Sequence, residues 1–184
     1  SADIDKLPMA AHGHGGEQGE EHEDGLDPHV WTSPELVKGM AAAIARELGE
    51  LNPQRADYYN ANLAEFTSDI EGLQSDIRAS LEPLASRKFM VFHPAWGYFA
   101  REFGLEQIAI ELGGTEPSAS QLADLLDEAR KEGIRVIFGQ PEFSTRSAVT
   151  IAREIGVAVI LITPLEENWL TNMERVAQAL TDNL

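Results

Sequence analysis

The chain has 184 residues, of which 31 are acidic and 14 basic, so its formal net charge is −17. This charge argues against nucleic acid and anionic membrane surfaces as partners, because both require a basic surface on the protein. The absence of cysteine excludes disulfides, thiolate metal sites and a cysteine nucleophile. A hydrophobic content of 43% suffices for a folded core.

Much of the acidity lies at the start of the chain. Residues 1–27 carry eight acidic side chains and one lysine, with His12, His14 and His22 among several glycines. Such a composition buries too little apolar surface to hold one conformation, so residues 1–26 are predicted to form a flexible acidic loop or tail. Imidazoles are good zinc ligands, which makes these three histidines candidate metal ligands. The alternative is a solvated low-complexity segment without a binding role.

Two helices are expected next. Ser33-Pro34-Glu35 has the residues of a helix start, with serine as N-cap and proline at the first helical position, and this helix is expected to stop near Gly49. A second start follows Asn52-Pro53. From there apolar residues recur every three or four positions and predict a helix over residues 54–82, which Pro83 ends. The apolar positions are Tyr59, Leu63, Phe66, Ile70, Leu73, Ile77 and Leu81.

The remainder of the chain alternates between short apolar runs and helical patterns. Strands are expected at residues 89–92, 107–111, 136–138 and 157–162. Helices are expected near 95–103, 119–132, 145–155 and 167–181. Ser118 and Gln121 have the spacing of a capping box. The alternation predicts an α/β fold in which helices flank a parallel sheet.

Two further histidines stand at positions that matter in such a fold. His93 directly follows the expected strand 89–92, and ligands of parallel sheets lie beyond the carboxyl ends of the strands. His29 lies between Pro28 and Val30, just before the first helix. The alternatives are structural: His93 as a helix-start residue bonded to backbone, and His29 as an ordinary turn residue.

The motifs around these histidines occur in an order that resembles a known family. They are Asp27-Pro28-His29-Val30-Trp31, the long helix, Phe92-His93-Pro94-Ala95-Trp96, Glu116-Pro117-Ser118, and Phe138-Gly139-Gln140-Pro141-Glu142. Together they are similar to the zinc- and manganese-binding periplasmic solute-binding proteins of bacterial ABC transporters (cluster A-I), and the acidic histidine-bearing loop is typical of the zinc branch.

The resemblance implies two α/β lobes, one long helix between them and a metal ion in the cleft. It makes His29 and His93 cleft ligands. Residues 27–53 then correspond to a remnant of the N-terminal lobe, 54–82 to the linking helix, and 83–184 to the C-terminal α/β metal-binding lobe.

The sequence departs from the family pattern in two respects. Most of the first lobe is missing, so the chain is expected to be a truncated form that supplies only part of the site. Thr163 occupies a position where many members have an aspartate ligand, which favours Zn²⁺ over Mn²⁺ because a neutral hydroxyl is a poor ligand for a hard cation.

The expected function is therefore extracytoplasmic binding of zinc for delivery to the membrane permease of an ABC importer. The expected location is periplasmic or otherwise extracytoplasmic, with membrane anchoring through a missing N-terminal segment. The surface that the absent lobe would cover is a candidate for dimerisation.

Two other classes of function use histidines of this kind. An enzyme is not expected, because His22-Glu23 lacks the second histidine of a zincin helix and no spacing supports Glu111, Glu116 or Glu142 as a general base. The remaining alternative is a metal-buffering or adhesin-like surface protein without a role in transport.

Overall fold

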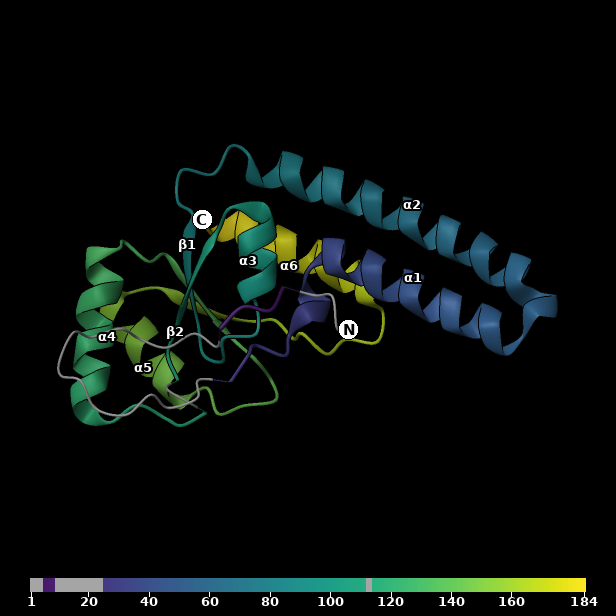
Figure 1. Cartoon of the computed structure of the whole chain (residues 1–184). Helices are drawn as coiled ribbons and strands as arrows, with labels where there is room; N and C mark the ends of the chain where they lie inside the picture. Colours follow the sequence, from purple (N-terminus) through teal and green to yellow (C-terminus); the bar gives the residue numbers. More distant parts are fainter. Residues whose placement is uncertain (1–4, 9–24, 112–113) are drawn as a thin grey trace.

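The computed structural model describes residues 5–8, 25–111 and 114–184, and a four-stranded parallel sheet lies at its centre (Figure 1). The strand order is β2-β1-β3-β4. The chain passes from β1 to β2 on one side of β1 and then crosses to β3 on the other side. A topological switch point therefore lies between β1 and β3. The strands are β1 (Lys88–Val91), β2 (Glu106–Ala109), β3 (Val136–Gly139) and β4 (Ala158–Leu161).

Helices lie on both faces of this sheet, which confirms the predicted α/β fold with a parallel sheet and flanking helices. The helices are α1 (Pro34–Leu51), α2 (Ala56–Leu81), α3 (Gly97–Phe103), α4 (Ala119–Lys131), α5 (Arg146–Ile155) and α6 (Trp169–Asn183), with 3₁₀ turns η1 (Val30–Thr32) and η2 (Pro53–Arg55). No helix of the described residues is long and apolar enough to cross a bilayer.

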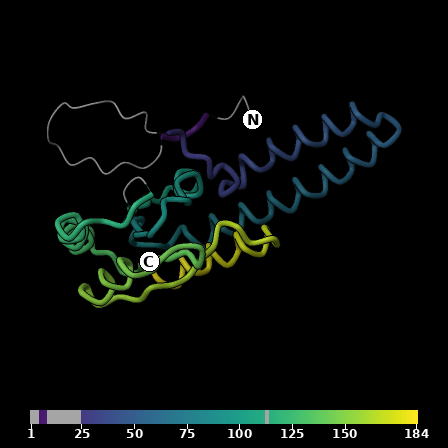
Figure 2. Tube along the Cα trace, turned by 90° about the horizontal axis from the view of Figure 1, so that it is seen from below, coloured from purple at the N-terminus to yellow at the C-terminus, as the bar shows by residue number. Residues whose placement is uncertain are grey.

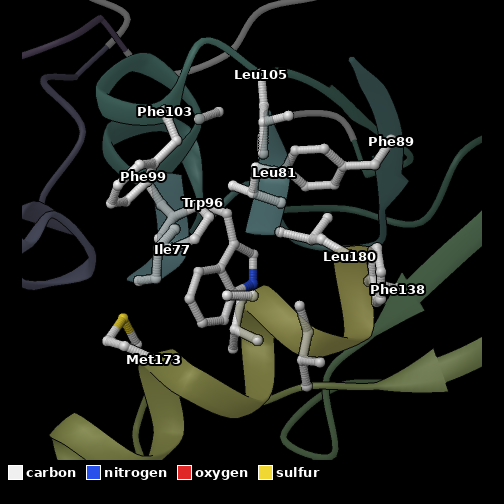
Figure 3. Close-up of a cluster of buried hydrophobic side chains, with 14 of the residues drawn as sticks. Ile77, Leu81, Phe89, Trp96, Phe99, Phe103, Leu105, Phe138, Met173 and Leu180 are labelled. Atoms are coloured by element: carbon white, nitrogen blue, oxygen red, sulfur yellow. The ribbon is translucent and has the colours of Figure 1, made fainter. Parts of the chain in front are cut away.

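Strand β1 shows why both faces are covered. Phe89 and Val91 point to one face and pack with α2, α3 and α6, as Figure 3 shows for several of these side chains. Met90 and Phe92 point to the other face and pack with α4 and α5. Side chains alternate along a strand, so the consecutive apolar residues Phe89, Met90 and Val91 are buried on both sides of the sheet. This burial fixes the carboxyl end of β1 and therefore the position of His93, which follows it.

Helices α1 and α2 form an antiparallel hairpin that projects beyond the sheet (Figures 1 and 2). The C-terminal half of α2 packs into the core, where Ile70, Ile77 and Leu81 are buried, whereas Tyr59 and Phe66 in its projecting half are only half-buried. The apolar stripe of α2 therefore serves two different environments along one helix.

The expected end of α1 near Gly49 is wrong by two residues. The helix continues to Leu51 and stops at Asn52, whose backbone is not helical. A glycine inside a helix costs only about 1 kcal/mol, which neighbouring turns offset. Asn52 precedes Pro53, and the proline ring excludes helical backbone at the preceding residue. Proline, not glycine, sets this boundary, whereas the predicted caps at Ser33 and Ser118 are confirmed.

An ion pair at the amino-terminal edge of the sheet leads to a prediction for stability against pH. Lys88 Nζ lies 2.7 Å from Glu132 Oε2, and its donated hydrogen bond lowers the pKa of Glu132 while raising that of Lys88. The pair stabilises the fold above the ordinary pKa of Glu132, and this contribution is lost as the pH falls through its lowered pKa. Glu132→Gln is therefore expected to lower Tm slightly near neutral pH, with the difference shrinking in acid.

Thermal unfolding between pH 3 and pH 8 measures this effect. The exposed Glu154 on α5 offers a matched control, because Glu154→Gln makes the same charge change without touching Lys88. A Glu132→Gln deficit that stays constant down to pH 3 would show that the ion pair is not its cause.

Candidate metal centre

His29 lies in a tight turn that its neighbours hold from both sides. The carboxylate of Asp27 accepts a hydrogen bond from the backbone N–H of His29 at 2.8 Å, and the hydroxyl of Thr32 donates to the His29 carbonyl at 2.9 Å. Asp27 and His29 are 3% and 8% exposed, so the imidazole faces protein on most sides. A glycine at position 97 makes room for this turn, because a side-chain carbon there would meet Asp27 Oδ2 at 3.2 Å.

Two tryptophans attach the same turn to the far end of the chain. The indole N–H of Trp31 donates to the Pro164 carbonyl at 3.0 Å, and the indole N–H of Trp169 donates to the Trp31 carbonyl at 2.8 Å. These reciprocal bonds join the η1 turn to the segment between β4 and α6. His29 is thereby fixed relative to the carboxyl ends of the strands.

His93 is placed by β1 and held by β3. It follows Phe92, a core residue that comes directly after β1. Gln140, which follows β3, accepts from the His93 backbone N–H at 3.0 Å and donates to the His93 carbonyl at 2.6 Å. The ring of Phe143 stacks on the imidazole with centroids 4.5 Å apart. The backbone and the ring plane of His93 are therefore both constrained at the switch point of the sheet.

The two imidazoles face each other through their Nε2 atoms, which are 3.2 Å apart. On the opposite sides, His29 Nδ1 lies 2.7 Å from Asp27 Oδ1, and His93 Nδ1 lies 2.6 Å from Glu111 Oε1. A carboxylate accepts, so a hydrogen on each Nδ1 would bond to it and leave the lone pair of each Nε2 free for a metal ion. The two Nε2 atoms face the same small space.

This arrangement has the geometry of a metal site. Zinc–nitrogen bonds of 2.0–2.1 Å at a tetrahedral angle place two ligand nitrogens roughly 3.3 Å apart, close to the observed separation. Metal-ligating histidines typically donate their other ring N–H to a carboxylate, as both do here. Within residues 5–8, 25–111 and 114–184, no group of three or more histidine or carboxylate side chains is arranged to hold an ion. The described part of the chain thus offers two candidate donors, His29 and His93.

The structure brings together two of the five histidines that the sequence singled out. His12, His14 and His22 lie outside the described residues. The described residues on either side of them are paired, since Pro8 forms an antiparallel bridge with Leu26 and the Asp27 N–H donates to the Leu7 carbonyl at 2.8 Å. The described residues that flank these histidines in the sequence therefore lie beside Asp27.

The remaining candidates have other partners. Thr163 donates its hydroxyl hydrogen to Glu142, so the hydroxyl that replaces the expected aspartate is engaged with a carboxylate. Glu116 accepts from Ser147, and Glu111 holds His93. Sequence reasoning missed the roles of Asp27, Glu111, Gln140 and Phe143. Their signal was position: the last three follow strands that end at the same edge of the sheet.

Comparison with known proteins places this geometry in context. The family model described as "Zinc-uptake complex component A periplasmic" matches residues 1–183. The chain belongs to this zinc-uptake component A family. The match confirms the resemblance seen in the sequence motifs.

Two relatives of this chain carry names that refer to zinc. The chain is 34% identical over 157 residues to the zinc-binding protein AdcA of Streptococcus pyogenes serotype M3, covering 84% of this chain and 30% of AdcA. It is 32% identical over 143 residues to the high-affinity zinc uptake system protein ZnuA of Bacillus subtilis, covering 77% of this chain and 45% of that protein. The chain thus spans less than half the length of these relatives.

Solved structures share the fold of this chain. A crystal structure of ZnuA superposes with a TM-score of 0.90 at 44% identity, covering 98% of this chain and 67% of that one. A Zn(II)-bound variant of AdcAII from Streptococcus pneumoniae superposes with a TM-score of 0.79 at 26% identity, covering 89% of this chain and 62% of that one.

Proposed function

We propose that this chain binds Zn²⁺ through Nε2 of His29 and Nε2 of His93, as part of an extracytoplasmic receptor that delivers zinc to an ABC importer. The observation that carries this proposal is the pair of inward-facing Nε2 atoms 3.2 Å apart, each backed by a buried carboxylate on Nδ1. The ion is cargo, so the receptor must bind it tightly and also release it to the membrane permease.

The chemistry of binding follows from the donor atoms. Each imidazole must be neutral at Nε2 to coordinate, so protons compete with zinc and affinity falls as the pH is lowered. Asp27 and Glu111 orient the rings and increase the basicity of the coordinating nitrogens. Zinc takes four ligands in a closed site, or three with an open position, so water or groups beyond the described residues complete its coordination.

The donor set favours zinc over manganese. Imidazole suits zinc, whereas manganese prefers carboxylate and carbonyl oxygens. The nearby carboxylates of Asp27 and Glu111 are occupied by Nδ1 atoms, and Thr163 offers only a hydroxyl. A zinc titration is therefore expected to show tighter binding than a manganese titration under the same conditions.

The paired ends of the segment 9–24 support a further part of the proposal. Because Pro8 and Leu26 adjoin Asp27, ions captured by His12, His14 and His22 are released close to His29. We expect these three histidines to act as a low-affinity collecting site.

A role in binding without catalysis fits a family of uptake components. The carboxylates that an enzyme would use as a general base are bonded to His93, Ser147 and Thr163.

A surface protein that buffers metal or adheres to host matrix is the second candidate. The laminin-binding adhesin Lmb of Streptococcus agalactiae superposes with a TM-score of 0.81 at 28% identity, which is the observation in its favour. In that case the histidine-bearing segment does the binding, and the His29–His93 pair contributes little.

Replacing residues 9–24 with a short Gly-Ser linker separates these two functions, because Pro8 and Leu26 stay in place to form their bridge. A receptor is expected to keep one tight zinc site and lose only weak binding in isothermal titration. A chain that changes His12, His14 and His22 together to asparagine, at native length, is the matched control. Loss of all zinc binding in both variants would reject the receptor and favour the buffer.

We also propose that this chain self-associates through the surface that the expected first lobe would cover, and the projecting hairpin, whose helix α1 lies within residues 27–53, supports this. A groove of about 270 Å³ lies between α1 and α2, lined by apolar residues that include Ile44, Leu48 and Leu63. Leu51 at the tip is 82% exposed. Sedimentation velocity over a concentration series tests this, since a chain that remains monomeric at high concentration contradicts it.

A further inference from the structure

The carboxylate of Glu102 lies where three helices meet. Glu102 belongs to α3, and its Oε2 accepts from the Ser33 hydroxyl at 2.5 Å and from the Glu35 backbone N–H at 3.0 Å. Its Oε1 accepts from the side-chain amide of Gln74, on α2, at 2.6 Å. Ser33 and Gln74 are each 3% exposed. Both oxygens of one carboxylate thus bind donors from the start of α1 and from the middle of α2.

The surroundings make this junction stiff. Glu102 faces the positive end of an 18-residue helix, where a carboxylate is favoured by the helix dipole and by free backbone N–H groups. Gln74 also donates to Glu35 at 3.2 Å, and Lys38 pairs with Glu35 at 2.8 Å. A polar network whose members are all satisfied holds one arrangement of its elements.

Both proposed zinc ligands are close in sequence to this junction. His29 lies four residues before Ser33, and the intervening η1 turn is closed by the Ser33 N–H donating to the Val30 carbonyl at 3.3 Å. His93 lies four residues before Gly97, where α3 begins. One carboxylate therefore connects the helix that continues from one ligand to the helix that continues from the other.

We propose that Glu102 is a positioning residue for the metal pair: it sets the separation of His29 and His93 by joining α3 to the start of α1. This inference rests on the proposed zinc function. Metal sites require their ligands within roughly 0.5 Å of the productive geometry, and the 3.2 Å separation of the Nε2 atoms meets that requirement in this arrangement. Glu102 itself touches neither imidazole in any contact of the described structure.

Glu102→Gln tests this role. The amide keeps the size of the side chain but offers one acceptor oxygen where the carboxylate offers two, so its NH₂ group must face either Gln74 or the Glu35 N–H. The zinc dissociation constant is expected to rise about 3- to 10-fold, less than the 10- to 100-fold typical of partners that contact a ligand directly. The visible absorption of the Co²⁺-loaded variant is expected to change, because it reports coordination geometry.

Two comparisons show whether the effect is positional. Glu71→Gln on an exposed turn of α2 makes the same charge change and is expected to leave the zinc affinity and the cobalt spectrum as in the native chain. In a His29→Ala background, Glu102→Gln is expected to cause no further loss, since no His29 remains to be placed. An equal loss in both backgrounds would show a general structural role and overturn the proposal.

A native zinc affinity in Glu102→Gln would also overturn it while leaving the zinc function intact. A native chain that binds no zinc would instead reject both. If Glu102→Gln does not fold by circular dichroism, Gln74→Met removes the α2 donor at similar volume, and the same criteria apply to it.

Discussion

Replacing His93 with alanine is expected to weaken zinc binding by more than about 100-fold, beyond the effect typical of residues that only support a ligand. The reason is that the described residues contribute two nitrogen donors, and the variant removes one of them. His29→Ala is expected to have a similar effect. Competition against a chromophoric zinc chelator, with the chain held in its folded state, measures both dissociation constants.

The other histidines provide a matched control for this experiment. His22→Ala removes one imidazole from the chain and leaves His29 and His93 in place, and it is expected to change the tight site little. The double variant His29→Ala/His93→Ala is expected to be only slightly weaker than either single variant, because residues of one site are not additive. If His22→Ala weakens zinc binding more than His93→Ala does, the tight zinc site is not the His29–His93 pair.

Removing the carboxylate behind either imidazole is the change with the next largest expected effect. Glu111→Gln and Asp27→Asn are each expected to weaken zinc binding about 10- to 100-fold. The amide is neutral, so the ring becomes less basic. The amide can also present its NH₂ to Nδ1, which stabilises the tautomer whose hydrogen is on Nε2 and blocks coordination. Nitrogen-15 NMR of the imidazoles in the zinc-free chain reports that tautomer directly.

Glu116 supplies the control for these variants. It is another carboxylate of the loops at this edge of the sheet, but its partner is Ser147 and not an imidazole. Glu116→Gln is therefore expected to leave zinc affinity near the native value. If all three variants weaken binding equally, the cause is overall charge and not the support of individual rings.

Local sequence signals were sufficient for most of the fold. The N-caps at Ser33 and Ser118 satisfy backbone donors that their own helices leave free, so they could be read without knowledge of distant residues. Each strand carries a short run of apolar residues, and the central strands β1 and β3 are covered on both faces, so the four strands are predicted within a residue or two of their observed bounds. The end of α1 was misplaced because a competing signal, Gly49, was given more weight than Pro53.

Local sequence signals predict only part of the candidate site. His93 could be placed at the end of a strand, because the run of apolar residues that precedes it is local. The partners of His93 could not be predicted in this way. The bond to Glu111 depends on β2 lying beside β1, and the bond to Gln140 depends on β3 lying on the other side of β1. Sequence order does not reveal strand order, so Glu111 remained a carboxylate without a role.

By itself, the sequence determined the elements, most of their ends and the two candidate histidines, because caps, periodicity and strand burial are local properties. Only the tertiary structure decided that Nε2 of His29 meets Nε2 of His93 across 64 residues, and that Trp31 is bonded to Pro164 across 133. Distances of about 3 Å between such residues follow from how the sheet and helices pack. A metal site depends on those distances, and they exist only after the chain has folded.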